Sequence, residues 1–190
     1  MAAHMPYDTR CEPNRIAPGE PFDADPQIDE YLRRAYHAQE DYRGFVRAVA
    51  ERGARPALVV QFGDHQPGLT LPAFEAAGET DALSNFRSAI YQTFYAVTPV
   101  RFTPAAPLPD VPALDLAYLG VTILEQAGLP LDPAFADKKS LRDRCEGAFH
   151  TCADRAAVLR HMKRLVRSDL LMTAAGLSAR RATSDARAPN

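Results

Sequence analysis

The chain has 190 residues, of which 46% are hydrophobic and 24% are charged, and its formal net charge is −2 at pH 7. This composition is typical of a globular protein, and the near-neutral charge argues against a nucleic-acid partner. No apolar run approaches the roughly 20 residues that span a bilayer, and the first residues have no signal-peptide pattern. We therefore expect no transmembrane segment in this chain.

The first half of the chain alternates helical and extended patterns. Residues 1–26 are rich in Pro, Asp and Arg and show no period. Apolar residues then recur at helical spacing and predict a helix over 27–52, with Asp25 as its N-cap and Gly53 as its stop. The apolar run 56–62 predicts a strand buried on both faces, which is typical of a parallel sheet.

Loop signals and β-prone residues follow this strand. Residues 66–80 contain Pro, Gly and Thr and predict a loop, and a short helix is expected over 81–88. Residues 91–97 are β-prone and predict a second strand. Residues 98–112 hold five prolines and predict an extended connection.

The second half of the chain is expected to be mainly helical. Helical patterns cover 114–127 and 154–174, and the stretch 129–151 between them is expected to be loop-rich, with one helical turn at most. The order of elements predicts an α/β domain over residues 1–175, with ligand sites at the C-terminal ends of its strands. The tail 176–190 has no period, and we expect it to be disordered.

The strongest chemical signal is Asp64-His65, which comes directly after the first predicted strand and Gly63. A carboxylate oxygen and an imidazole nitrogen at a strand end are ligands that suit zinc, manganese or a similar divalent ion. A polar turn with no ligand is the alternative, because a two-residue motif often occurs by chance.

Four stretches of the sequence together resemble the sulfatase-like domain of the alkaline phosphatase superfamily, nearest the lipoteichoic-acid-synthase and phosphoethanolamine-transferase branch. They are VVQFGDHQP, YQTFY, LDLAYLG and QAGLP, at residues 59–67, 91–95, 114–120 and 126–130. The resemblance covers about residues 4–152 and only the later part of the family's domain. It implies a partial alkaline-phosphatase-like α/β fold, with a central, mostly parallel sheet flanked by helices and a loop- and helix-rich C-terminal region.

The resemblance also assigns residues. Asp64 and His65 become metal ligands, for an ion that could be Mn, Zn, Mg or Ca. The segment from His4 to Tyr7 resembles the family's Asn-His-x-Pro-[Phe/Tyr] segment, whose histidine helps bind the substrate's phosphate or sulfate. His4 is therefore a candidate substrate-binding residue, with a cloning remnant as the alternative because of its place near the start of the chain.

The function implied is that of a metal-dependent hydrolase or transferase acting on sulfate or phosphate esters, with lipid-linked esters as one option. In the family, the first acidic metal ligand and a Thr, Ser or formylglycine nucleophile come before the His-x-Pro segment, and no residue here matches them. No catalytic residue is assigned, so we expect the chain to be inactive alone, with a membrane anchor possible upstream in the parent protein. The alternative is a truncated, non-catalytic α/β module that binds metal or anions weakly at most.

Two cysteines, Cys145 and Cys152, are separated by six residues that include His150. Spacing alone leaves a disulfide and two free thiols equally open, and a zinc site with His150 matches no standard module. Both cysteines fall in a stretch that resembles a late element of some family members. We predict the disulfide, and with it a periplasmic or extracytoplasmic location for the parent protein.

A basic stretch lies within the last predicted helix. It contains His161, Lys163, Arg164 and Arg167. Such a face is usually solvated, and contact with an anion or with a membrane surface is the alternative.

Overall fold

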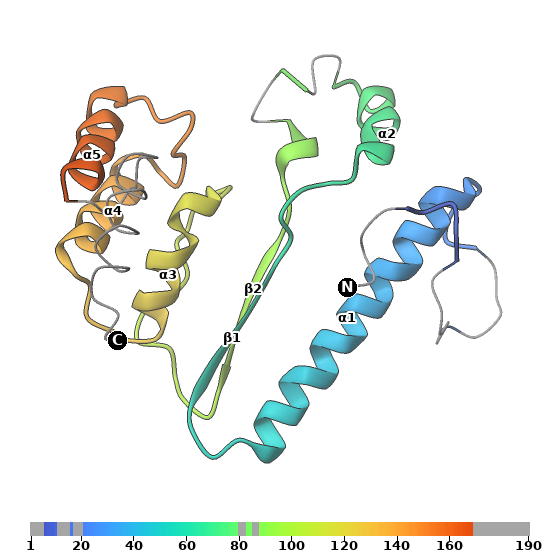
Figure 1. The fold of residues 1–190 in the computed structure, drawn as a ribbon, viewed down its shortest axis with the longest axis horizontal. Coiled ribbons are helices and arrows are strands. Elements are labelled where there is room, and N and C mark those ends of the chain that lie inside the picture. Colours follow the sequence, from blue (N-terminus) through green and yellow to red (C-terminus); the bar gives the residue numbers. More distant parts are fainter. Residues whose placement is uncertain (1–5, 11–15, 17–20, 80–82, 85–87, 169–190) are drawn as a thin grey trace, which may run out of the picture. The chain divides into compact units, whose positions relative to one another are not determined.

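Figure 1 shows the fold, a computed structural model that describes residues 6–10, 16, 21–79, 83–84 and 88–168. Chain contacts divide the protein into two compact units, Met1–Thr103 and Pro104–Asn190. The fold mixes helices and strands: the described ranges hold five α-helices and one two-stranded sheet. No helix in these ranges is long and apolar enough to cross a bilayer. His4 and the tail 176–190 lie outside the described residues.

The long first helix, α1, spans Pro26–Arg52, as the sequence predicts. Asp25 caps its amino end, because its carboxylate accepts hydrogen bonds from two amides of the first turn. Gly53 follows its last turn. The guanidinium group of Arg101 binds this end of the helix by donating to three backbone carbonyls, those of Val49, Ala50 and Arg55.

Charged side chains are buried on one face of α1. Glu30 accepts hydrogen bonds from the Nε atoms of Arg33 and Arg34, at 2.8 and 2.6 Å, and all three residues are at most 6% exposed. Arg34 also donates from Nη2 to the carbonyl of Thr9, at 2.6 Å. A buried guanidinium group is costly unless its donors are paired, and this network pairs them. The bond from Arg34 to Thr9 also ties residues 6–10 to α1.

The two strands, β1 (Ala57–Phe62) and β2 (Tyr95–Val100), pair antiparallel, with Ala57 opposite Val100 and Phe62 opposite Tyr95. The predicted first strand is confirmed within one residue, and the second begins four residues later than predicted. No parallel pair is seen among the described residues. The prediction that β1 is buried on both faces is wrong: its residues are only partly buried, and Phe62 is 50% exposed.

The segment between the strands departs from the predicted loop and helix. A 3₁₀ turn at Gly68–Thr70 leads into the short helix α2, Leu71–Ala76, and a second turn covers Ala89–Tyr91. The predicted helix over 81–88 falls largely outside the described residues. Helix α2 was missed because it has only six residues, too few to show an amphipathic period.

The second unit packs three helices around a small core. They are α3 (Leu119–Gln126), α4 (Pro133–Arg144) and α5 (Arg155–Arg167). The core residues come from all three helices, from the turn before α3 and from the disulfide: Tyr118, Val121, Leu141, Cys145, Cys152, Ala157 and Val158. Within the described residues, both helices are shorter than predicted. The helix predicted over 114–127 begins at Leu119, and the described part of the one predicted over 154–174 is Arg155–Arg167.

Helix α4 contradicts the prediction that residues 129–151 are loop-rich. Asp132 caps it by accepting a hydrogen bond from the Phe135 amide at 2.8 Å, and Pro133 occupies its first turn. Ion pairs stabilise its exposed side, including Lys139 with Asp143 at 2.7 Å. Its large apolar residues are few, so no periodic pattern marks the helix in the sequence.

Candidate metal site at the end of the first strand

Gly63 sets the backbone geometry that precedes the Asp64–His65 pair. Its amide donates to the carbonyl of Phe94 at 3.0 Å, which continues the pairing of β1 and β2 by one residue. A Cβ atom on Gly63 would lie 2.0 Å from the Oγ1 atom of Thr93, far inside van der Waals contact. Glycine therefore lets the two strands stay close together at the point where the polar residues begin.

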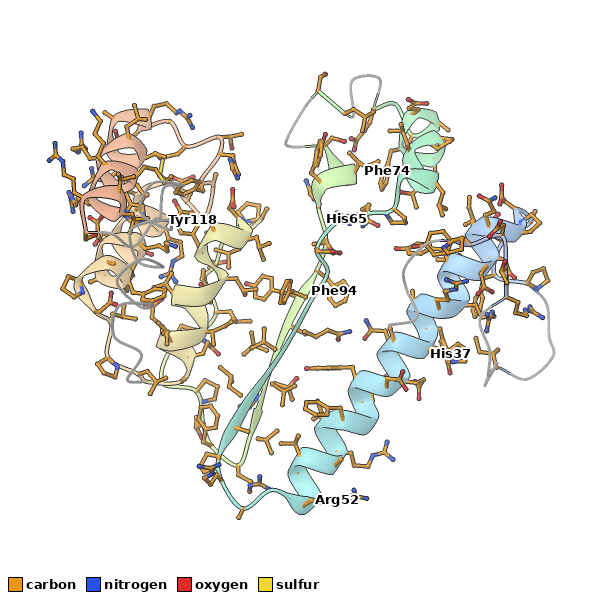
Figure 2. All side chains as sticks on the ribbon, viewed as in Figure 1. His37, Arg52, His65, Phe74, Phe94 and Tyr118 are labelled. Atoms are coloured by element: carbon orange, nitrogen blue, oxygen red, sulfur yellow. A yellow bond between two sulfur atoms is a disulfide. The ribbon has the colours of Figure 1, made fainter. Side chains whose placement is uncertain are left out.

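Asp64 and His65 follow the end of β1 with exposed side chains, 75% and 66% accessible. Figure 2 labels His65 at this strand end. The backbone amide of His65 donates to Asp64 Oδ1 at 2.9 Å. The Nδ1 atom of His65 lies 3.0 Å from the carbonyl oxygen of Gln66. Because a carbonyl oxygen can only accept, Nδ1 carries the hydrogen in this contact, and in the neutral ring Nε2 holds the free lone pair.

The Nε2 atom of His65 lies 3.6 Å from Asp64 Oδ2. Two ligand atoms at about 2.1 Å from one ion and at a tetrahedral angle lie about 3.4 Å apart, so this separation fits two ligands of one ion. An Nδ1–H bound to a backbone carbonyl is also the usual second contact of a metal-ligating histidine. The donor set and its geometry fit a divalent ion. The described residues contain no group of three or more His, Cys, Asp or Glu side chains that could hold one.

Gln66 connects the pair to α1 and to the second strand. Its Nε2 atom donates to the carbonyl of Gln92 at 3.0 Å, and its Oε1 atom accepts from the Tyr31 hydroxyl at 3.4 Å. The Gln66 side chain thus links the Asp64–His65 turn to α1 and to the segment just before β2. These two contacts limit the movement of the Asp64 and His65 ligand atoms.

Tyr7 places the start of the described chain in the same region. Its side chain is buried, its ring packs edge-on against that of Tyr31 with the centroids 5.7 Å apart, and the Arg34 guanidinium lies over it. Burial raises the pKa of Tyr7, and the charges of Tyr31 and Asp64 add to this, while Arg34 acts in the opposite direction. The Asp64 carboxylate is therefore near enough to Tyr7 for its charge to act on the hydroxyl.

No role was predicted from the sequence for Tyr7 or Tyr31. His4, the candidate substrate-binding residue, lies outside the described residues, but Tyr7 follows it by three positions. The contacts of Tyr7 with Tyr31 and Arg34 tie the start of the described chain to α1. No local pattern marks either tyrosine, because the ring contact between Tyr7 and Tyr31 joins positions far apart in the sequence.

The disulfide between Cys145 and Cys152 is confirmed, with its Cα atoms 5.0 Å apart. It lies in the second unit, joining the C-terminal end of α4 to the loop before α5. Both sulfurs are used in this bond, which rules out the alternative zinc site with His150. The His150 side chain is exposed, with Nε2 3.9 Å from Asp115 Oδ2.

A comparison of the chain with protein families, with curated proteins and with solved structures finds no match in any of the three. The family, the substrate and the cellular location expected from the sequence therefore remain predictions.

Proposed function

We propose that Asp64 and His65 are two ligands of a divalent metal in a sulfatase-like catalytic centre that hydrolyses or transfers sulfate or phosphate esters. The observation that carries the proposal is the geometry of the pair: Nδ1 of His65 is engaged by a carbonyl, and its Nε2 lies 3.6 Å from Asp64 Oδ2. Both side chains are exposed at the end of a strand, where an ion and a substrate can reach them.

The ion would neutralise charge that develops on the transferred group. The roles of the protein groups are to hold it and to orient its ligands. Gln66 fixes the His65 ring through its carbonyl and fixes the turn through its side chain. His4, which lies outside the described residues, is the proposed substrate-binding residue.

Two ligands are too few for a catalytic ion, which usually has three or more from the protein. The remaining ligands and the oxygen nucleophile would come from groups other than the described residues. The substrate would be a sulfate or phosphate ester on the extracytoplasmic side. The disulfide supports this location, since such bonds persist in oxidising compartments.

We further propose that β1 and β2 form one edge of a larger, mostly parallel sheet. Pro99 lies within β2, and proline is found in edge strands because it cannot donate to a neighbour. Additional strands would then pair with β1 on its other side. The half-exposed Phe62 at the end of β1 supports a larger fold around this sheet, because apolar side chains on a sheet are normally covered.

The test is zinc and manganese titration of the purified chain by calorimetry, with His65→Ala and Asp64→Ala as variants. The matched control is His150→Ala, which removes the histidine of another exposed His–Asp pair. We expect weak binding that the two site variants abolish and that the control variant retains. Binding lost in His150→Ala and retained in His65→Ala would refute the site.

The non-catalytic module is the competing function, and the lack of a third acidic, histidine or cysteine ligand among the described residues favours it. An assay with aryl sulfate and phosphodiester substrates separates the two when the chain is supplied with the segment that should hold the nucleophile. We expect metal-dependent turnover that Asp64→Ala abolishes. Metal binding without turnover in this reconstituted protein would favour the module.

A further inference from the structure

Helix α5 carries two parallel rows of exposed side chains. On a helix, residues three and four apart in sequence lie on the same face. The first row consists of three aliphatic side chains that are 55%, 37% and 49% exposed; this apolar row is Leu159, Met162 and Val166. Each of them is followed in sequence by an exposed cationic residue; this cationic row is Arg160, Lys163 and Arg167. The two rows therefore run side by side for about 10 Å along the helix.

The packing of the second unit uses neither row. The buried face of α5 is formed by other residues, Ala157, Val158 and His161. Two further arginines of the helix have partners, since Arg155 donates to a backbone carbonyl at 2.8 Å and Arg164 pairs with Asp137. The residues of the cationic row make no hydrogen bond or ion pair with the part of the chain that the structure describes. The helix itself contains no Asp or Glu that could neutralise them.

This arrangement narrows the kind of partner that fits. An apolar row beside unpaired cations requires apolar surface and negative charge in the same order. A second copy of α5 would bring one cationic row near another, and residues 169–190 hold three arginines against two aspartates, so neither supplies the missing negative charge. Protein interfaces are usually anchored by aromatic side chains held in pockets, whereas α5 offers three aliphatic side chains on a convex helix.

We propose that α5 docks on the surface of an anionic lipid bilayer. The apolar row would enter the boundary between the headgroups and the acyl chains, and the cationic row would lie level with the lipid phosphates. Helices that lie in this boundary combine an apolar face with a polar face rich in Lys and Arg, whose flexible stems let the charges reach the phosphates. This surface lies in the second unit, and the proposal does not rest on the proposed metal site.

The test of the charge is sedimentation of the full chain with vesicles of phosphatidylglycerol and phosphatidylcholine, and with vesicles of phosphatidylcholine alone. We expect binding only to the anionic vesicles, and weaker binding at high ionic strength. Changing the whole cationic row to glutamine should weaken this binding about tenfold or more. The matched control removes the same charge from three exposed arginines of the first unit, Arg47, Arg52 and Arg55.

We expect the control to change the affinity less than about threefold. Circular dichroism of both variants verifies that they are folded. If the triple variant does not fold, Lys163→Gln alone should still weaken vesicle binding about threefold or more.

The test of the apolar row is fluorescence. The chain has no tryptophan, so Met162→Trp places a single indole in this row. On anionic vesicles its emission should shift to shorter wavelength and be quenched by brominated acyl chains. Phe45→Trp, at an exposed position of α1, is the control and should show neither change. Leu159→Gln leaves the charge unaltered and should weaken vesicle binding about fivefold or more.

Several results would overturn the proposal. One is no binding to anionic vesicles at millimolar lipid. Another is an equal loss in the cationic-row variant and its control, which would show diffuse attraction of charge, or bound protein whose Met162→Trp emission does not shift. A dimer in analytical ultracentrifugation that Leu159→Gln dissociates would make a second copy the occupant of this face. Binding of an acidic amphipathic peptide, without binding to vesicles, would make the occupant a protein.

Discussion

Replacing Tyr118 by phenylalanine isolates the effect of a buried hydroxyl group on stability. Tyr118 is 0% exposed, and its hydroxyl has no hydrogen-bond partner among the described residues. Burial raises the pKa of Tyr118 from 10.0 to about 12, and the nearby Asp115 charge adds to the effect. At neutral pH we expect Tyr118→Phe to stabilise the protein by up to about 1 kcal/mol, because it removes an unpaired buried polar atom.

At alkaline pH the difference should grow. Because the pKa is higher in the folded protein, the unfolded chain loses the Tyr118 proton first. Titration of Tyr118 therefore leaves the free energy of unfolding unchanged below pH 10.0 and lowers it as pH rises towards about 12. Two pKa units correspond to at most about 2.7 kcal/mol, and about half of this should be lost at about pH 11. The phenylalanine variant has no such loss, and all other titrating groups cancel in the comparison.

The assay is urea unfolding of both proteins, followed by far-ultraviolet circular dichroism, over a series of pH values between 8 and about 12. The slopes of the two transitions must agree, so that the free energies of unfolding can be subtracted. A difference that stays constant over this range would show that the Tyr118 hydroxyl is solvated or paired, and would refute the reasoning.

Three further changes test the packing. Changing Cys145 and Cys152 to serine should lower the free energy of unfolding by about 2.5 kcal/mol, because the bond closes a loop with a sequence separation of 7; chemical denaturation with and without reductant measures this. Gly63→Ala should cost about 1–3 kcal/mol through the clash with Thr93, and Thr93→Gly should restore much of it; a purely additive double-mutant cycle would contradict the clash. Glu30→Ala should cost about 3–5 kcal/mol, because it leaves two buried guanidinium groups without their carboxylate; thermal unfolding checks this, and a loss under about 1 kcal/mol would show that solvent reaches them.

The sequence predicted those parts of the fold whose signals are local. Helix α1 has both a long apolar period and clear end residues, so its bounds were predicted almost to the residue. The core of β1 was predicted from its continuous apolar run. The disulfide was predicted because both cysteines lie in a stretch that resembles a late element of some family members, since their spacing alone left free thiols equally open.

Other features depend on contacts that no local pattern records. The sequence of α4 lacks the apolar period of an amphipathic helix. An Asp132 cap, ion pairs and the packing of Leu141 stabilise the helix instead. Whether β1 and β2 pair parallel or antiparallel depends on how the chain between them returns. A run of apolar residues occurs in both kinds of strand and does not distinguish them. A buried strand was expected, but the described residues provide no second layer over Phe62.

The candidate metal site was predictable as a pair of residues but not as a geometry. The motif placed Asp64 and His65 at the end of a strand, and the structure places them there. The tautomer of His65 follows from the carbonyl of Gln66, and the approach of Tyr7 follows from its packing on Tyr31. Both depend on backbone direction and on long-range contacts, which residue types alone do not specify.

The most direct measurement of the Asp64–His65 site is amide NMR of the full chain during addition of Mn²⁺, whose unpaired electrons broaden signals of nearby nuclei. If the pair binds the ion, the amides of Gly63 to Gln66 should broaden first, at the lowest metal concentration, and Asp64→Ala should remove the effect. Broadening that begins around Asp137 and Asp143, with residues 63–66 unaffected, would contradict the assignment of a metal to this strand end.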